Sequence, residues 1–254
     1  MKICCLMKQV PDTEVQPGVT HDETDIDRDN IKYVINPYDE FAIQEASRLK
    51  QEHPDSEVIV LLLGEEKSKE RIRTALAMGC DKGILIKGED ISQLDPITVA
   101  QELSEYLKDK DFDIILAGKK AVDHDFGIVG PAVASFLGIP VVTAIHSFDL
   151  DIKSRKVICK REGHKGEEVI ETLLPAVFTC EKGLNKPKYP SLPSIMKAKK
   201  KIIEEIQFSN KPSLSRTLKL TVPKVQREGV IIEGDTEKQV QEVIRLMKEK
   251  VKIL

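Results

Sequence analysis

The chain has 254 residues, of which 41% are hydrophobic and 32% charged, and 39 basic against 42 acidic side chains give a net charge of −3. This length is enough for one large domain or two small ones, and the balanced charge gives no global preference for nucleic acid or membrane surfaces. The longest apolar runs, such as 58–63, are far shorter than the roughly 20 residues that cross a bilayer. We expect no nucleic-acid partner and no membrane span.

The cysteines are five in number, and no two of them have CxxC spacing. An odd count without paired spacing argues against a disulfide framework, and the five scattered histidines argue against a structural zinc site. We therefore expect reduced thiols, no bound metal and a cytoplasmic location. Cys4 and Cys5 are adjacent in an expected strand, so they should point to opposite faces of it.

Residues 1–145 alternate short apolar runs with amphipathic helical patterns, which is typical of βα units that feed a mostly parallel sheet. Strands are expected at 3–7, 58–63, 84–86, 114–117 and 141–145, with a helical segment in each interval. The first helix should begin with Asn36 as its cap and Pro37 in its first turn, and the third should begin at Asp95. Gly79 and Gly138 should end the second and fourth helices. This pattern predicts a doubly wound α/β domain.

The pattern changes after residue 145. Segments 147–151, 156–161 and 169–173 are typical of an antiparallel meander that extends one edge of the sheet, and 174–179 is a further apolar run. From 182 to 203 there are seven lysines and no acidic residue. This shift in composition predicts a domain boundary near residue 182, and the prolines at 187, 190 and 193 indicate an extended connector beyond it.

The last segment has the pattern of an amphipathic helix. Val240, Val243, Ile244, Met247 and Val251 recur at helical spacing and form an apolar stripe. The stripe either packs on the domain of its own chain or reaches another subunit, and the pattern favours neither. We thus divide the chain into an α/β domain, 1–182, and an extended C-terminal arm with a terminal helix, 183–254.

The best candidate for a ligand site is the loop that follows the strand at 114–117. Residues 118–131 place glycines at the start of the fourth helix, and free N–H groups at a helix N-terminus favour anions such as phosphate. There is no GxGxxG after the first strand and no GxxxxGK[ST], so a mononucleotide is the cautious expectation. Asp123 and Asp125 could hold a ribose or a metal, but capping of the helix is the more favoured interpretation. No catalytic constellation is present, so we do not expect an enzyme.

Several motifs together resemble one known family along nearly the whole chain, more weakly after about residue 206. They are KQVPD at 8–12, NPY at 36–38, RTALAMG at 73–79, the loop 118–131, LPAV at 174–177 and LNKPKYPSLPSIMKAKKK at 184–201. In this order they resemble the β subunits of electron transfer flavoproteins.

That resemblance implies a Rossmann-like, adenine-nucleotide-binding α/β fold and a non-catalytic electron carrier. The carrier would be a heterodimer whose α subunit chiefly holds the redox FAD, while this chain buries an AMP. The positions that match the AMP site are Leu6, Asn36, Leu63, Gly64, Asp123, His124, Asp125, Phe126, Gly127, Ile128, Val129 and Gly130.

In the electron-bifurcating branch of that family a second FAD replaces the AMP. His124 and Phe126-Gly127-Ile128 depart from the pattern of that branch, whereas Val129-Gly130-Pro131 resembles it. We favour AMP over FAD because His124 would crowd a flavin.

The resemblance also implies docking residues. The family's recognition loop corresponds to 183–193, with Leu192 as the side chain that enters an apolar pocket on an acyl-CoA dehydrogenase, and its neighbours are Tyr189, Pro190, Ser191 and Pro193. By the same likeness, Thr13 and Tyr38 would lie near the flavin of the α subunit, and Glu162 would face its mobile flavin domain.

Electrons would pass from flavin dehydrogenases to a quinone oxidoreductase or another acceptor. Two alternatives from other classes are an ATP-binding stress-type or nucleotide-hydrolysing protein, and a nucleotide-stabilised scaffold without a redox role.

Overall fold

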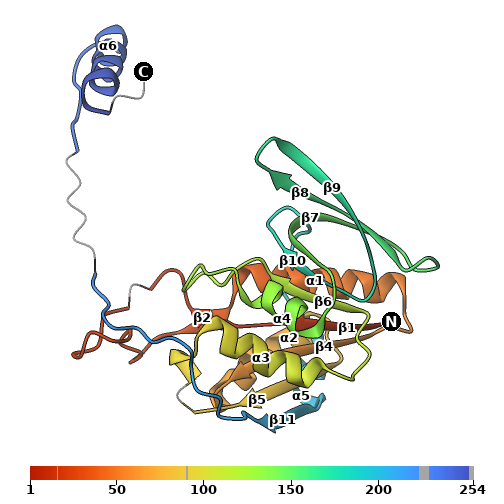
Figure 1. Cartoon of the computed structure of the whole chain (residues 1–254). Helices are drawn as coiled ribbons and strands as arrows, with labels where there is room; N and C mark the ends of the chain where they lie inside the picture. The colour runs from red at the N-terminus through yellow and green to blue at the C-terminus, as the bar shows by residue number, and fades with distance from the viewer. Residues whose placement is uncertain (16, 90, 223–228, 252–254) are drawn as a thin grey trace. The chain divides into compact units, whose positions relative to one another are not determined.

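The apolar runs of the sequence form one sheet in the computed structural model, which describes residues 1–15, 17–89, 91–222 and 229–251, with residue 251 described by its backbone alone (Figure 1). The chain divides into two units, Met1–Leu220 and Thr221–Leu254, so the first unit continues past residue 182. Within the described ranges, no helix is both long enough and apolar enough to cross a membrane.

Nine strands of the first unit form a sheet in the order β11-β5-β4-β1-β6-β10-β7-β8-β9. The parallel strands are β11 (Ile203–Gln207), β5 (Lys82–Lys87), β4 (Glu57–Gly64), β1 (Lys2–Leu6), β6 (Ile114–Gly118), β10 (Ala176–Cys180) and β7 (Val141–Asp151). The antiparallel strands are β8 (Lys156–Gly163) and β9 (Gly166–Leu173), which extend one edge. The mostly parallel sheet and the antiparallel edge are therefore confirmed.

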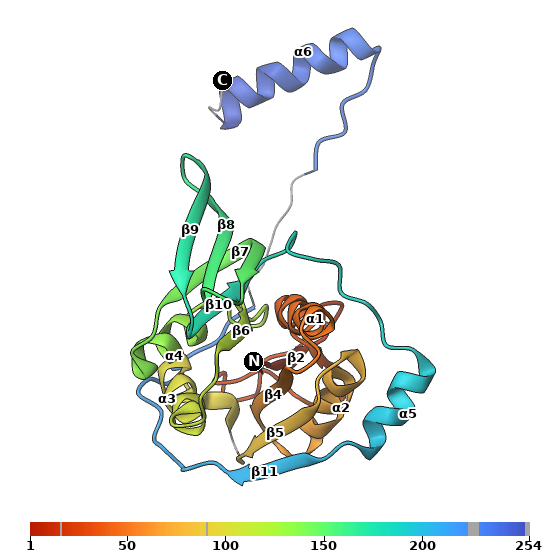
Figure 2. The same cartoon turned by 90° about the vertical axis from the view of Figure 1, so that its right-hand side faces the viewer.

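Helices cover both faces of this sheet, as Figure 2 shows. One face packs on α1 (Pro37–Glu52), α2 (Lys69–Met78) and α5 (Leu192–Lys200), and the other packs on α3 (Pro96–Leu107) and α4 (Val129–Leu137). Side chains alternate between the faces, so Cys5 joins the first core and Cys4 the second, as expected. The doubly wound architecture is confirmed.

The strand order reverses beside β1, and this reversal positions the site. The chain runs from β1 through α1 to β4 on one side, and it later returns through α3 to β6 on the other side of β1. In doubly wound sheets, ligands bind at the carboxyl ends of the strands at such a switch point. Those ends are Leu6, Gly64 and Gly118.

Helix ends follow the expected signals in part. The Asp95 carboxylate accepts hydrogen bonds from the N–H groups of Ile97 (2.8 Å) and Thr98 (3.1 Å) and so caps α3. Gly79 ends α2 with φ 138°, and Gly138 ends α4 in the left-handed conformation. Asn36 and Pro37 stand at the start of α1 as expected, but the Asn36 side chain makes no capping hydrogen bond and bonds instead to a distant loop.

Three features differ from the sequence-based expectation. The runs 141–145 and 147–151 are one strand, β7, with a bulge between Ile145 and Ser147. The segment after 182 is not only an extended connector, because it contains α5 and the edge strand β11. A separate antiparallel pair, β2 (Gln9–Pro11) with β3 (Tyr33–Ile35), has no counterpart among the expected elements.

The second unit is described by itself. Its helix α6 (Thr236–Leu246) begins at Asp235, whose carboxylate accepts from the Lys238 N–H at 3.0 Å, and a turn of π-helix, Met247–Val251, follows. The expected terminal helix is confirmed. Val240, Val243 and Ile244 are 51%, 43% and 40% exposed.

The Asp95 carboxylate also forms hydrogen bonds with the segment that follows β11. One of its oxygens accepts from the hydroxyls of Thr98 (2.7 Å) and Ser213 (3.0 Å) and from the Leu214 N–H (2.6 Å). Burial raises the pKa of Asp95, but these hydrogen bonds outweigh it and hold the pKa well below the ordinary 3.8.

We expect Asp95→Asn to lose about 1–2 kcal/mol of stability at pH 7, because an amide replaces one accepting oxygen with a donor. A carboxyl whose pKa is lower in the folded chain adds stability above the unfolded pKa and loses it as the pH falls. The difference between the two proteins should therefore shrink below about pH 4. Urea denaturation from pH 3 to 7 measures it, with the exposed Asp55→Asn as control, and a pH-independent difference would contradict this account.

Candidate functional site

A cleft that is open to solvent lies at the carboxyl ends of β1, β4 and β6, beside the start of α4. Among the sequence-predicted site residues, the structure brings eleven to this cleft. They are Leu6, Asn36, Leu63, Gly64, Asp123, His124, Phe126, Gly127, Ile128, Val129 and Gly130. Asp125 is not among the lining residues, and its carboxylate is instead 2.7 Å from the Lys120 ammonium at the surface.

Asn36 ties the start of α1 to the loop after β6. Its side-chain N–H₂ donates to the Lys120 carbonyl (2.9 Å) and the Asp39 carboxylate (3.0 Å), and its oxygen accepts from the Val122 N–H (3.1 Å). The side chain is only 1% exposed, so water cannot replace these partners. Asn36 thus holds the loop in place along one side of the cleft.

Asp39 is buried beneath the same side. Its carboxylate accepts from the backbone N–H groups of Lys8 (2.7 Å) and Gly118 (2.9 Å), which follow β1 and end β6, as well as from Asn36. Burial is the larger effect and raises the pKa of Asp39 to about 7. A pKa above its unfolded value means that this group's contribution to stability is full below about pH 4 and is lost as the pH rises through 7.

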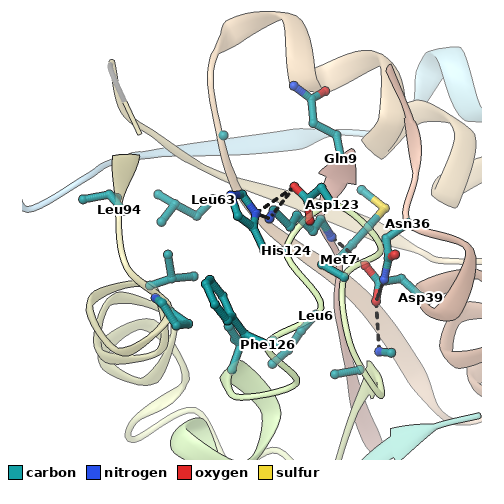
Figure 3. Close-up of a pocket in the computed structure, with 18 of the residues that line it drawn as sticks. Leu6, Met7, Gln9, Asn36, Asp39, Leu63, Leu94, Asp123, His124 and Phe126 are labelled. Atoms are coloured by element: carbon teal, nitrogen blue, oxygen red, sulfur yellow. Dashed lines mark hydrogen bonds and ion pairs between the residues drawn. The ribbon is translucent and has the colours of Figure 1, made fainter. Parts of the chain in front are cut away.

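A charged cluster lies at the mouth of the cleft. The Lys8 ammonium is 2.7 Å from the Asp123 carboxylate and 3.2 Å from His124 Nδ1, and the His124 ring stacks on Phe126 with centroids 5.6 Å apart (Figure 3). Partial burial raises the pKa of Asp123, but His124 and Lys8 outweigh it and lower the pKa to about 2. The expectation that Asp123 and Asp125 cap α4 is wrong, because lysines hold both carboxylates and α4 has no side-chain cap.

The start of α4 offers free backbone donors. The N–H groups of residues 126–130 donate no hydrogen bond to any described residue, and Gly127 has φ 64°, a left-handed conformation that glycine allows. Consecutive free N–H groups at a helix N-terminus form an anion-binding surface. Gly130 has a different reason to be glycine, since a Cβ there would lie 2.6 Å from Thr179.

The opposite side of the cleft is apolar. Figure 3 shows Leu63, Leu94 and Phe126 facing Asn36 and Asp39 across it. Phe126 is 60% exposed. An apolar side, a polar side and a row of free N–H groups suit a flat apolar ring joined to an anion.

One part of the cleft is not predicted by the sequence. Arg28 lies there, with its guanidinium 3.0 Å and 3.2 Å from the two Asp25 oxygens and 3.1 Å from the Tyr33 hydroxyl. The Lys67 ammonium lies 5.5 Å from the centre of the Tyr33 ring. The sequence of this acidic loop carries no signal for its place beside the cleft, because that place depends on contacts distant in the sequence, such as Lys67 with Tyr33 and Ser92 with Asp25.

The remaining predicted residues lie outside the cleft. Thr13 is exposed, and the Tyr38 ring lies 5.1 Å from the Lys119 ammonium, which pairs with Glu181. Glu162 is exposed on β8 and pairs in register with Glu167 of β9.

Around α5, Tyr189 is 95% exposed and Leu192 is 78% exposed. Leu192 is the first residue of the helix, Pro193 follows it in the first turn, and the Ser191 hydroxyl caps the helix. Pro190 lies in the loop that precedes this cap.

The cysteine side chains are buried and do not line the cleft. The five cysteines are unpaired and buried, and burial raises the pKa of Cys159 to about 12. In the described part of the chain, no group of three or more His, Cys, Asp or Glu side chains is arranged to hold a metal ion.

Fold and cleft together define a doubly wound α/β protein with a candidate anion site at its switch point. The family described as electron transfer flavoprotein domain matches residues 24–211. The chain is 38% identical to the electron transfer flavoprotein subunit beta of Bacillus subtilis, over 100% of both chains, and 35% identical to that of Syntrophomonas wolfei, over 100% of this chain and 98% of the relative. It is 38% identical to the human one, over 82% and 81%. The chain belongs to the electron transfer flavoprotein family and is similar to its β subunits.

Proposed function

We propose that this chain is the non-catalytic half of a heterodimeric electron carrier. Its partner is an electron transfer flavoprotein α subunit that chiefly holds the redox FAD, and the flavin accepts and releases the electrons. Thr13 and Tyr38 lie toward that flavin, Glu162 faces the flavin domain of the α subunit, and α6 contacts the same subunit. The exposed apolar stripe of α6 supports this last assignment.

The cleft at the switch point carries the second part of the proposal, which is an AMP of structural role in this chain. The phosphate would bind the free N–H groups of residues 126–130, and the base would lie against Leu63 and Phe126. Asn36 and Asp39 hold the loop against which the nucleotide packs. Asp125 would act only from the surface, through its pair with Lys120.

We favour AMP over a second FAD because the mouth of the cleft is filled. Lys8, Asp123 and His124 are joined there, and His124 stacks on Phe126. A dinucleotide with a flavin ring would have to displace this cluster, whereas a smaller mononucleotide would not.

Mass spectrometry of the nucleotides released by denaturing the purified heterodimer tests this part. We expect one AMP and one FAD for each heterodimer. Two FAD molecules would place the chain in the electron-bifurcating branch and contradict the AMP assignment, and a preparation without flavin would contradict the electron-carrier proposal itself. ATP turnover by the purified protein would instead support the nucleotide-hydrolysing alternative.

Leu192 is the docking residue in this proposal. It is a large apolar side chain, 78% exposed, at the start of a capped helix, next to Tyr189, which is 95% exposed. Pro190 and Pro193 restrict the backbone around it and Ser191 caps the helix, which lowers the entropic cost of docking. The partners are flavin dehydrogenases of the acyl-CoA dehydrogenase type, and a quinone oxidoreductase or another acceptor receives the electrons. The proposed location is the cytoplasm, because unpaired thiols suit a reducing compartment.

A further inference from the structure

Arg73 of α2 and Lys201, which follows α5, each cap the C-terminal end of the other helix. Arg73 of α2 donates through Nη1 to the carbonyls of Ala198 (2.8 Å) and Lys201 (2.5 Å), at the end of α5. Lys201 in turn donates through Nζ to the carbonyls of Leu76 (3.2 Å) and Cys80 (2.5 Å), at and just beyond the end of α2. The last carbonyls of a helix lack intrahelical partners, and cations are favourable there.

The two helices also share apolar packing. Ala198 is 1% exposed and belongs to the same core as Ile72, Ala75 and Leu76 of α2. Leu192, Ile195 and Met196 of α5 are 78%, 37% and 60% exposed. These three residues lie on the exposed side of α5, and the hydrogen bonds of Arg73 and Lys201 attach the helix to α2. These hydrogen bonds, which we call the anchor, therefore determine where the three side chains point.

The loop before α5 is fastened to a different helix. The Asn185 side chain donates to the Phe41 carbonyl of α1 (3.0 Å), and the Lys188 N–H donates to the Gln44 side chain (3.0 Å). The chain on the N-terminal side of Leu192 is therefore attached to α1, and the chain on its C-terminal side is attached to α2. A surface side chain fixed in this way loses less conformational entropy when a partner binds.

We propose that Arg73 and Lys201 are positioning residues that orient α5 for docking, and this inference rests on the proposed role of Leu192. Neither residue is assigned a contact with the dehydrogenase. They act by keeping the C-terminal end of α5 attached to α2, so that the apolar side chains of its exposed face meet the partner in one arrangement.

The test uses the intact heterodimer as electron acceptor of an acyl-CoA dehydrogenase, with Arg73→Met and Lys201→Met. Each change keeps a long apolar stem and removes the donors. We expect KM for the heterodimer to rise at least fivefold (about 1 kcal/mol), with kcat and flavin content unchanged. Lys200→Met is the matched control, because it removes the same charge from the neighbouring position, the last residue of α5, where the side chain is exposed.

Equal effects of Lys200→Met and Lys201→Met would overturn the proposal, since the loss would then be one of charge alone. An unchanged KM in both anchor variants, beside a raised KM in Leu192→Ala, would overturn the anchor and leave the docking role intact. An unchanged KM in Leu192→Ala would instead remove the docking role.

Hydrogen exchange measures the anchor without the dehydrogenase. We expect faster exchange of the α5 amides in Arg73→Met and Lys201→Met but not in Lys200→Met, and unchanged protection would overturn the proposal. Arg73→Lys keeps a cation at the position and serves if Arg73→Met does not fold. It should restore part of the protection, and exchange as fast as in Lys201→Met would count against the anchor.

Discussion

Replacing Leu192 with alanine should raise the KM of an acyl-CoA dehydrogenase for the heterodimer by roughly thirtyfold, the effect of losing about 2 kcal/mol at an interface hot spot. The side chain is 78% exposed in this chain, so its truncation creates no cavity and should not affect folding. Alanine is also a good residue for the first turn of α5. Steady-state kinetics with the heterodimer as the varied substrate measure this change.

The matched control is Leu218→Ala, because Leu218 is 75% exposed and has no role in the proposal. Flavin content and the absorption spectrum should be the same in both variants as in the unmodified protein. A KM that Leu192→Ala leaves unchanged would show that docking uses another surface. A similar rise in Leu218→Ala would show that the effect is not specific to α5.

The first half of the fold could be predicted because its signals are local. Apolar runs, helical spacing and the cap at Asp95 place the strands and helices up to residue 145 without knowledge of the tertiary structure. The segment after residue 182 could not be predicted in the same way, because three prolines there indicate an extended chain. Pro193, however, lies in the first turn of α5, where the missing N–H has no intrahelical partner to lose. In β11, Glu204 and Glu205 hide the pattern of an edge strand.

The candidate site shows the same division. The loop 118–131 could be predicted from its glycines and its place between a strand and a helix, and it does line the cleft. The hydrogen bonds between this loop and the start of α1 could not, because Asn36 and Lys120 are 84 residues apart. The sequence predicts a side-chain cap at Asn36, but in the folded chain this side chain bonds to Asp39, Lys120 and Val122 instead.

Asn36→Ala should be the most destabilising substitution at the site, with a loss of about 3–5 kcal/mol. It removes two donated bonds and one accepted bond of a residue that is 1% exposed. The Val122 N–H and the Lys120 carbonyl would lose partners, and each unsatisfied buried group costs about 1–3 kcal/mol. Because the loop would no longer be held, we also expect the nucleotide content of the purified protein to fall severalfold. Urea denaturation and the released nucleotide measure the two effects.

The pH dependence of this loss separates it from a general packing defect. The Asn36 amide donates to Asp39, whose pKa is about 7, and it stabilises the charged form of that carboxyl. Without this donor the pKa of Asp39 should rise further, so the stability difference should be larger at pH 8 than at pH 5. Gln51→Ala truncates an exposed amide near the other end of α1 and should have a small, pH-independent effect. If the loss in Asn36→Ala were the same at both pH values, the interaction with Asp39 would not contribute to it.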